Sequence, residues 1–247
     1  MKSKALIGDI KTLAHMAFYR KTGSDHAERL ENFYARQAEH YDNFRERLLK
    51  GRKKMLGKCL PMVPGGQWAD LGGGTGANLE FAVAELEKFQ QIYIVDLSKS
   101  LLEQAEKRIE RNGWQQVSCL NKDVEQPVFT PQSLDLVTFS YSLTMIPNWF
   151  AAVDQAFAAL KPGGLVAVTD FFVSRKNAAT EADQHSTLTR TLWPLWFGID
   201  NVFLNPDHPP FLQWKFQELE FYHSKSRIPF LPGVKVPYYT FIGRKPG

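Results

Sequence analysis

The stretch 68–78, WADLGGGTGAN, holds the residues best suited to binding chemistry. A short apolar run ends in Asp70, four glycines follow within five residues, and a helical pattern opens at Ala77. Glycine lets the backbone turn sharply and lets a ligand lie against the main chain. The N–H groups at the start of a helix make such a site electropositive. The pattern predicts a strand, a tight turn and a helix that together hold a nucleotide-like cofactor.

Two cofactors suit this turn. The spacing Gly72-x-Gly74-x-x-Ala77 satisfies the dinucleotide fingerprint, so NAD stays open. Asp70 stands at the strand end, where it would repel a pyrophosphate but hold an ammonium group. The stretch resembles the first motif of class I S-adenosylmethionine methyltransferases, whose strand-end acid lies near the methionine moiety of the cofactor. A glycine loop without a ligand is the remaining alternative.

Acids also follow the second and third predicted strands. In an open parallel sheet, ligands bind beyond the carboxyl ends of the strands. Asp96 lies about twenty residues beyond the turn, where an acid meets ribose hydroxyls; otherwise it caps the helix near Ser98. Asp123 can accept a hydrogen bond from an adenine amine, with Val124 against the ring; otherwise it is a solvated loop acid. A second acid here fits S-adenosylmethionine better than NAD.

The fourth and fifth predicted strands end where a methyl acceptor should lie. The block 140–147, SYSLTMIP, contains Tyr141, whose ring can face a cationic amine or sulfonium and is otherwise a core aromatic. Asp170 can bind an acceptor ammonium or a proton, or else acts as a structural cap. Methyl transfer from a sulfonium is an in-line displacement, so positioning supplies most of the rate gain. An amine acceptor must lose its proton to a nearby acid, a tyrosine or a chain of waters.

Alternating strand and helix patterns position these residues. Strands are predicted over 67–71, 91–96, 117–120, 134–140 and 165–173, and helices over 77–89, 98–112 and 148–160, with a turn at 161–164. Repeated strand–helix units predict a parallel sheet covered on both faces. Two strand-like stretches, 219–223 and 238–243, joined by a proline-rich segment, predict an antiparallel final pair. The predicted fold class is α/β, a Rossmann-like, mostly parallel seven-stranded sheet with an antiparallel last strand and an N-terminal helical cap.

The chain is expected to divide at about residue 65. Residues 1–65 show helical patterns over 4–20, from Ser24 toward Gln37 and from about Asp42 to Leu60, and are predicted to cap the site. Residues 66–247 are predicted to form the cofactor-binding domain, with an insertion at 174–215 that is rich in Trp, Phe and Pro. Such a long insertion usually carries function. The basic first helix suits a membrane interface, or packing on its own domain or a second subunit.

Composition narrows the function classes. A hydrophobic share of 44% over 247 residues is enough for a real core. The net charge of +4 permits attraction to anionic lipid without demanding it, and no nucleic-acid motif is present. The two cysteines are far apart and the histidines do not cluster, so neither zinc nor a disulfide framework is expected, and a reducing compartment fits. No apolar run is long enough to span a bilayer, and the N-terminus is a poor signal peptide.

The block 33–52, FYARQAEHYDNFRERLLKGR, is not generic to class I methyltransferases. Together with 70–76, 140–147 and 170–174, it resembles the methyltransferase component of betaine-lipid synthases, from about residue 30 to the last strand. The resemblance implies three methylations of the amine of diacylglyceryl-homoserine, by a cytoplasmic protein associated peripherally with a membrane. In some organisms this domain is fused to the transferase that makes the acceptor. This chain is too short for that second domain, so a separate enzyme is expected to supply it.

The resemblance also suggests roles for individual residues. Aromatic faces for the cation are expected from Tyr34, Tyr41, Tyr141 and Trp193, and a grip on the acceptor carboxylate from Arg45, Arg47 or Arg52. The predicted catalytic residues are Tyr141, Tyr41 and Asp170. The predicted residues of the S-adenosylmethionine site are Asp70, Gly72, Gly73, Gly74, Thr75, Gly76, Asp96, Leu97, Asp123, Val124, Ser140, Tyr34 and Arg52, with no metal.

Three other functions stay open on the sequence. The first is a methyltransferase for a soluble amine or a quinone-like ring. The second is a cofactor-binding module without catalysis, such as a partner subunit, and the third is an NAD dehydrogenase. No nucleic-acid partner is expected, and assembly into a homo-oligomer is an open alternative.

Overall fold

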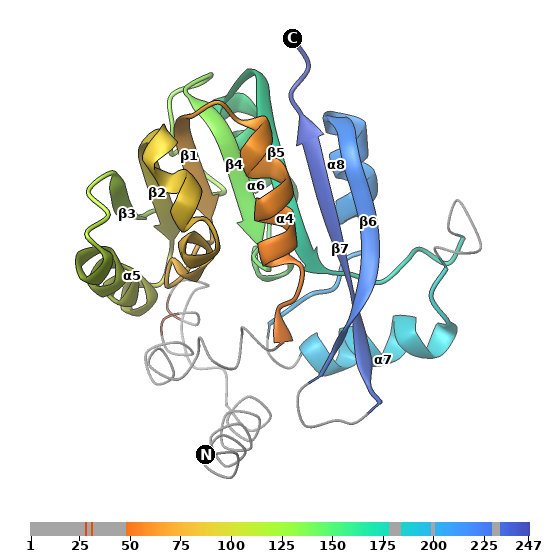
Figure 1. The fold of residues 1–247 in the computed structure, drawn as a ribbon. Coiled ribbons are helices and arrows are strands. Elements are labelled where there is room, and N and C mark those ends of the chain that lie inside the picture. The colour runs from red at the N-terminus through yellow and green to blue at the C-terminus, as the bar shows by residue number, and fades with distance from the viewer. Residues whose placement is uncertain (1–27, 29–30, 32–47, 178–183, 199–200, 229–232) are drawn as a thin grey trace.

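A seven-stranded sheet forms the centre of the molecule, a computed structural model that describes residues 28, 31, 48–177, 184–198, 201–228 and 233–247. The strand order is β3-β2-β1-β4-β5-β7-β6 (Figure 1). The strands are β1 Gly66–Leu71, β2 Phe89–Asp96, β3 Val117–Asn121, β4 Leu134–Ser140, β5 Leu160–Phe171, β6 Gln217–Arg227 and β7 Lys235–Arg244. The first five strands are parallel, and β7 runs antiparallel to both of its neighbours. The predicted sheet is therefore confirmed.

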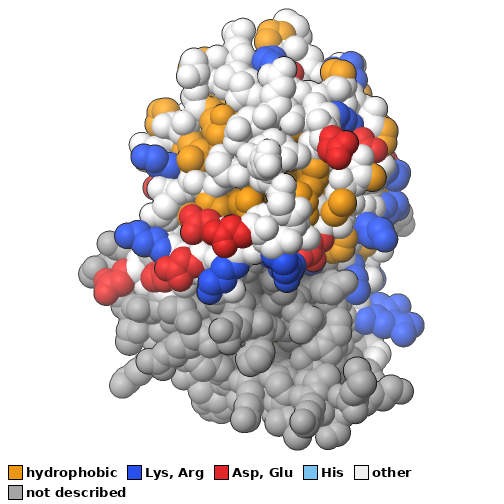
Figure 2. All heavy atoms as spheres, turned by 60° about the vertical axis from the view of Figure 1, so that its left-hand side comes forward, with side chains coloured by type: hydrophobic (Ala, Val, Ile, Leu, Met, Phe, Trp, Pro, Cys, Tyr) orange, Lys and Arg blue, Asp and Glu red, His pale blue; other side chains and the backbone are white. Residues whose placement is uncertain are grey.

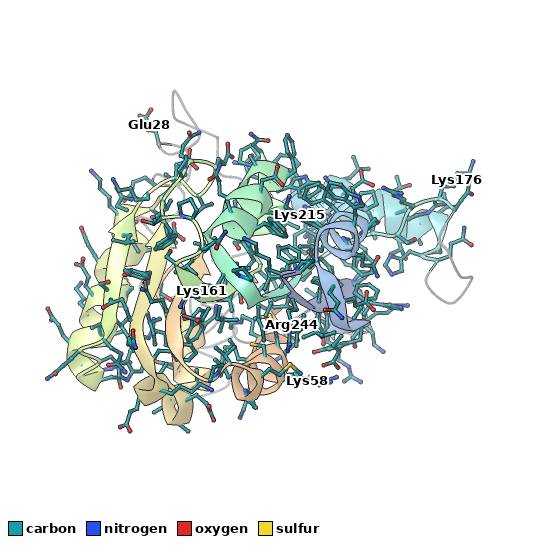
Figure 3. All side chains as sticks on the ribbon, turned by 90° about the horizontal axis from the view of Figure 1, so that it is seen from above. Glu28, Lys58, Lys161, Lys176, Lys215 and Arg244 are labelled. Carbon is teal, nitrogen blue, oxygen red and sulfur yellow. The ribbon has the colours of Figure 1, made fainter. Side chains whose placement is uncertain are left out.

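Helices cover both faces of the sheet. The helices α4 Arg52–Cys59 and α5 Lys99–Asn112 share one hydrophobic core with the short helices η2 Ala77–Phe81 and η3 Val83–Lys88. The helices α6 Trp149–Ala159 and α8 His208–Lys215 pack in a second core on the opposite face. Figure 3 accordingly shows Lys58 of α4 and Lys215 of α8 on opposite sides of the sheet. Cover on both faces explains why β1 and β4 are buried almost throughout.

The helix α7 Thr187–Gly198 lies at the carboxyl edge of the parallel strands, beside the far end of the β6–β7 hairpin (Figure 1). Its residues Trp193 and Phe197 belong to a third core, which also contains Tyr141 and Phe171 from the strand ends. Within the described residues of the predicted insertion 174–215, the structure places the helices α7 and α8. Among the described residues, no helix is long and apolar enough to cross a membrane.

Three local predictions were wrong. The expected helix over 77–89 is two short 3₁₀ helices, because the backbone leaves helical geometry at Ala82, with φ −117° and ψ 7°. The expected helix from about Asp42 to Leu60 is interrupted before α4 by Gly51, whose φ is +91°. A Cβ at Gly51 would lie 2.7 Å from the ring of Tyr238, so glycine is what lets the chain pass the sheet edge here. The expected turn at 161–164 lies inside β5.

The face formed around β3 and α5 carries mixed charges. Figure 2 brings this side of the molecule forward and shows lysine and arginine side chains interspersed with acidic ones. Arg108 and Arg111 of α5, for example, both pair with Glu80, with N–O distances of 2.8 and 3.1 Å. This face therefore presents charges that largely neutralise one another.

Candidate active site

The glycine turn after β1 has a backbone that other residues cannot adopt without strain. Gly72, Gly74 and Gly76 have φ values of +67°, +56° and +69°. A Cβ at Gly72 would lie 2.4 Å from the Cβ of Ser142, and one at Gly76 would lie 2.7 Å from Cδ1 of Ile94. Glycine is needed at both places for conformation and for space. The predicted tight turn is present, and it packs directly against its neighbours.

Asp96 joins this turn to the next strand and helix. Its carboxylate accepts hydrogen bonds from the backbone N–H of Gly74 and of Ser98, both at 2.9 Å. The N–H of Gly72 donates to the carbonyl of Val95 at 2.8 Å. Asp96 therefore lies both at the glycine turn and at the start of α5. This position is compatible with ribose binding and with helix capping, the two roles predicted for it. Its contact with a ribose stays a prediction.

Asp70 is the centre of a buried chain of hydrogen bonds. Asn78 Nδ2 donates to one carboxylate oxygen at 2.9 Å, and Thr138 Oγ1 donates to the other at 2.6 Å. Trp68 Nε1 donates to Thr138 at 2.9 Å, and Arg52 Nη1 donates to Asn78 Oδ1 at 3.5 Å. The chain runs from α4 through η2 and β1 to β4. It holds the strand-end acid in one orientation beneath the glycine turn.

Burial sets the charge of Asp70. Because the residue is fully buried, its pKa rises from 3.8 to about 6, although the hydrogen bonds from Thr138 and Asn78 and the charge of Arg52 oppose this shift. The acid thus ionises close to neutral pH. A cationic group brought beside it would restore the ionised form and gain a charge-assisted interaction.

Arg52 reaches the site from the first residue of α4. Its Nε donates to the carbonyl of Leu49 at 3.2 Å, and its guanidinium lies 5.3 Å from the ring centre of Phe81. The side chain is buried, and Asn78 links it to Asp70 by hydrogen bonds. The sequence analysis selected Arg52 but missed Asn78. The available signal was its position as the first polar residue after the glycine turn.

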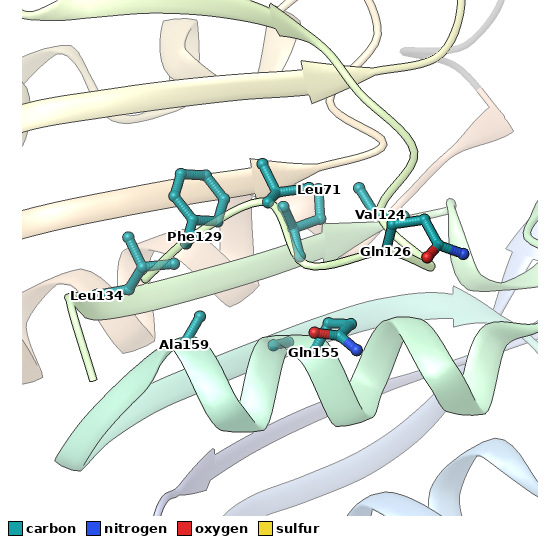
Figure 4. Close-up of a pocket in the computed structure, with 9 residues that line it drawn as sticks. Leu71, Val124, Gln126, Phe129, Leu134, Gln155 and Ala159 are labelled. Atoms are coloured by element: carbon teal, nitrogen blue, oxygen red, sulfur yellow. The ribbon is translucent and has the colours of Figure 1, made fainter. Parts of the chain in front are cut away.

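Asp123 and Val124 occupy the loop that follows β3. The carboxylate of Asp123 accepts from the N–H of Glu125 at 2.9 Å and so closes a local turn. Val124 is buried on the α6 face of the sheet. There it lines a small, mainly apolar cavity (Figure 4) with Leu71, Gln126, Val128, Phe129, Leu134, Gln155, Ala156 and Ala159. The geometry gives Asp123 a turn-forming role, and the contact with adenine stays a prediction.

Tyr141 has a backbone that is rare for an aromatic residue. Its φ is +57°, in the left-handed region, where strain of this kind clusters at functional sites. Its N–H donates to the carbonyl of Thr169 at 2.8 Å, and its Oη donates to the carbonyl of Lys50 at 2.6 Å. Burial, and next the charge of Asp170, raise the pKa of the phenol well above its usual range. Tyr141 therefore stays protonated at neutral pH and does not serve as a base.

Ser140 and Thr75 are both buried beside the turn. The Oγ of Ser140 has no hydrogen-bond partner among the described residues, which is unusual for a buried hydroxyl and suits a ligand contact. The carbonyl of Thr75 accepts from Arg108. The carbonyl of Leu97 accepts from Asn121 Nδ2 at 2.8 Å, so Leu97 is held at the end of β2 by its backbone.

Asp170 does not face an open site. It is fully buried, and its carboxylate accepts from the N–H and the Oγ1 of Thr144 at 3.1 and 2.7 Å and from the N–H of Phe171 at 2.8 Å. Burial is the main reason that its pKa rises to about 7. Of the two predicted roles of Asp170, acceptor binding and structural capping, this geometry matches capping. The residue connects the turn η4 Leu143–Met145 to β5.

Several predicted residues lie outside the described part of the chain. These are Tyr34, Tyr41, Arg45 and Arg47. Trp193 is described and is buried, so its indole belongs to the third core. Within the described residues, no cluster of three or more histidine, cysteine or acidic side chains is arranged to hold a metal.

Comparisons with known proteins point to a methyltransferase domain. Residues 69–166 match the model of a family described as a methyltransferase domain. The chain is 28% identical over 142 residues to the ubiquinone/menaquinone biosynthesis C-methyltransferase UbiE of Bartonella bacilliformis, covering 54% of each protein. It is 25% identical to the aklanonic acid methyltransferase DauC of a Streptomyces species, covering 59% of this chain and 66% of DauC. The chain thus spans about half the length of UbiE, the first of these relatives.

Solved structures share the fold. Phosphoethanolamine N-methyltransferase 2 of Haemonchus contortus, in complex with S-adenosyl-L-methionine, aligns with a TM-score of 0.65 at 17% identity, over 93% of this chain and 62% of that protein. The YcgJ protein of Bacillus subtilis aligns with a TM-score of 0.58 at 15% identity, over 78% and 99%. The class I methyltransferase fold and a methyltransferase domain are therefore confirmed. The methyltransferase-domain match and the S-adenosyl-L-methionine complex of the Haemonchus contortus protein are in line with the predicted cofactor.

Proposed function

We propose that this protein is an S-adenosylmethionine-dependent N-methyltransferase that converts diacylglyceryl-homoserine into its trimethylated betaine lipid at a membrane surface. The observation that carries the proposal is the block 140–147, which resembles betaine-lipid synthases and packs against the glycine turn. Ser142 Oγ donates to the carbonyl of Leu71 at 2.9 Å, and its Cβ fills the space that glycine leaves open at position 72. The block 140–147 and the glycine turn are therefore held at a fixed distance from each other.

This arrangement suits methyl transfer from the sulfonium of the cofactor to a neutral amine, whose lone pair displaces the sulfur. Asp70 would attract the ammonium group of the cofactor, and the Ser142 contact would fix the distance from the methyl group to the acceptor side. Tyr141 and Phe171, whose ring centres are 4.6 Å apart, form an aromatic pair beside that position. Aromatic faces stabilise sulfonium and quaternary ammonium groups without offering a nucleophile. Both Tyr141 and Asp170 are already hydrogen-bonded, so water is proposed to take the proton of the amine.

An assay of methyl transfer tests this proposal. The protein is incubated with labelled S-adenosylmethionine and diacylglyceryl-homoserine in mixed micelles, and the lipids are analysed by mass spectrometry. We expect mono-, di- and trimethylated lipid to appear in succession. Diacylglycerol, which lacks the amine, is the matched control acceptor. Absence of label from diacylglyceryl-homoserine, with cofactor binding intact by calorimetry, would sink the proposal.

A second candidate is C-methylation of a quinone-like ring. The observation that favours it is the 28% identity to UbiE, which is named as a ubiquinone/menaquinone C-methyltransferase. This substrate is also a membrane lipid, so the two candidates share an apolar approach to the site. The same assay with a demethylated quinol separates them. Label on the ring and none on the lipid amine would replace the first proposal with this one.

A further inference from the structure

The helix α7 carries large apolar side chains on its solvent side. At helical spacing along this side lie Leu188, Leu192, Leu195 and Trp196, which are 73%, 42%, 69% and 42% exposed. The opposite side carries Trp193 and Phe197, which are buried. The helix has no acidic residue. Because both of its sides are apolar, its outer stripe is not explained by packing within the described part of the chain.

The buried side of α7 leads directly to the candidate site. The ring of Phe197 lies 4.9 Å from that of Phe171, which in turn lies 4.6 Å from that of Tyr141. A helix with its side chains is about 10 Å across. The outer stripe is therefore separated from Tyr141 by the thickness of one helix and two ring-to-ring contacts.

A group of exposed lysine and arginine side chains, here called the cationic tip, lies beside α7. Lys225, Arg227 and Lys235 are exposed at the far end of the β6–β7 hairpin, and Arg227 and Lys235 face each other in the strand register. Within the described residues, none of the three forms an ion pair. Like charges directly opposite each other destabilise a strand pair, so the fold itself gains nothing from them. The same hairpin contributes Ile228 and Val236 to the core that holds α7.

We propose that the outer stripe of α7 and the cationic tip together dock on an anionic lipid bilayer. An apolar helix face with a tryptophan inserts at the boundary between headgroups and acyl chains, while lysine and arginine bind anionic headgroups. A bilayer can contact the apolar stripe and the cationic tip at the same time, because α7 and the β6–β7 hairpin pack in the same core. The inference rests on the proposed function and deepens it, because it would bring the block 140–147 close to the lipid surface.

Vesicle flotation tests the two parts separately. Wild-type protein is floated with vesicles of phosphatidylcholine alone and with added phosphatidylglycerol. We expect the double variant Leu188→Ser, Leu195→Ser to lose about tenfold in partitioning for each leucine. We expect the triple variant Lys225→Gln, Arg227→Gln, Lys235→Gln to lose about fivefold for each charge, and only with the anionic vesicles at low salt.

Two matched controls lie away from this surface. Val83→Ser removes a 55% exposed apolar side chain from η3, and Lys107→Gln removes an exposed charge from α5. Both should float like the wild type. Cofactor binding by calorimetry confirms that every variant is folded.

The outcomes separate the two proposals. If the stripe variant floats like the wild type, the docking surface is wrong whatever the activity. If flotation depends on the stripe but no lipid amine is methylated, the proposed reaction fails while the docking surface stands. If wild-type protein does not float and the stripe variant changes the sedimentation coefficient, a second copy of the chain covers α7 and the inference is overturned.

Discussion

The glycine turn and the helix α7 lie at the same edge of the sheet, but the first buries polar groups and the second exposes apolar ones. Around the turn, polar groups are buried and paired: Asp70 is held by Asn78 and Thr138, and Asp96 by two backbone N–H groups. Around α7, apolar groups are exposed, with Leu188 at 73% and Leu195 at 69%. A buried polar network holds one geometry, because any broken bond leaves an unpaired group. An exposed apolar face gains stability only when something else covers it.

This difference suits the two substrates of a methyl transfer, a donor held in one position and an acceptor that enters from outside. The methyl donor must be held in one place, and the turn has the rigidity for that. The proposed lipid acceptor would enter from outside, and the exposed apolar side of α7 would lie on its approach. If this contrast is correct, substitutions in the glycine turn and in α7 should have clearly different effects.

The variant Gly72→Ala should damage the rigid part most. A Cβ there would lie 2.4 Å from that of Ser142, at a φ of +67°. Strain and overpacking together should lower the free energy of unfolding by about 4 kcal/mol, as measured by urea denaturation. The control is Gly57→Ala in α4, where a Cβ meets nothing within 4 Å. It should instead stabilise the protein by about 1 kcal/mol. Equal stabilities for the two variants would show that the turn is not rigid.

The two sides of α7 should differ in the same measurement. Phe197→Ala removes a buried ring that contacts Phe171 and Trp193, and should lower the free energy of unfolding by about 3 kcal/mol. Leu195→Ala, on the exposed side, should change it by less than about 0.5 kcal/mol. A large loss from Leu195→Ala would mean that the outer stripe is already packed in the free protein.

Replacing Asp70 should separate cofactor binding from folding. In Asp70→Asn the charge that would attract the cofactor ammonium is lost, which should weaken binding of S-adenosylmethionine about thirtyfold at pH 7.5, or about 2 kcal/mol. Because the pKa of Asp70 is about 6, wild-type affinity should fall as the pH drops below that value. Calorimetry across pH 5 to 8 checks both effects. A similar pH dependence in the variant would mean that another group titrates.

The smallest expected effect is on stability. Burial raises the pKa of Asp70 from 3.8 to about 6, so the folded protein favours the protonated acid. The resulting stabilisation is complete below pH 3.8 and is lost as the pH rises through about 6. At pH 8, Asp70→Asn should therefore be as stable as the wild type or up to about 1 kcal/mol more stable. A marked loss of stability in thermal unfolding at pH 8 would instead mean that ionised Asp70 holds the fold together.

The sequence predicted the turn after β1 and the acids at the strand ends well, for a local reason. Glycine conformations, strand alternation and an acid at a strand end are encoded within a few residues, so Asp70, Gly72 and Asp96 were found where the structure places them. Local signals were weaker where two conformations suit one pattern. The apolar spacing of 77–89 fits one α-helix as well as the two 3₁₀ helices that form.

Residue patterns along the chain were therefore enough to predict the sheet, the glycine turn and the acids at the strand ends. The contacts between distant segments follow from the packing of the sheet: Arg52 donates to Asn78, and the carboxylate of Asp170 accepts from Thr144. Tertiary packing also decided which side of α7 is buried, because both sides are apolar and the choice depends on the rings of Tyr141 and Phe171 beneath it. Contacts of this kind depend on strand order and on distant segments, which residue spacing along the chain does not encode.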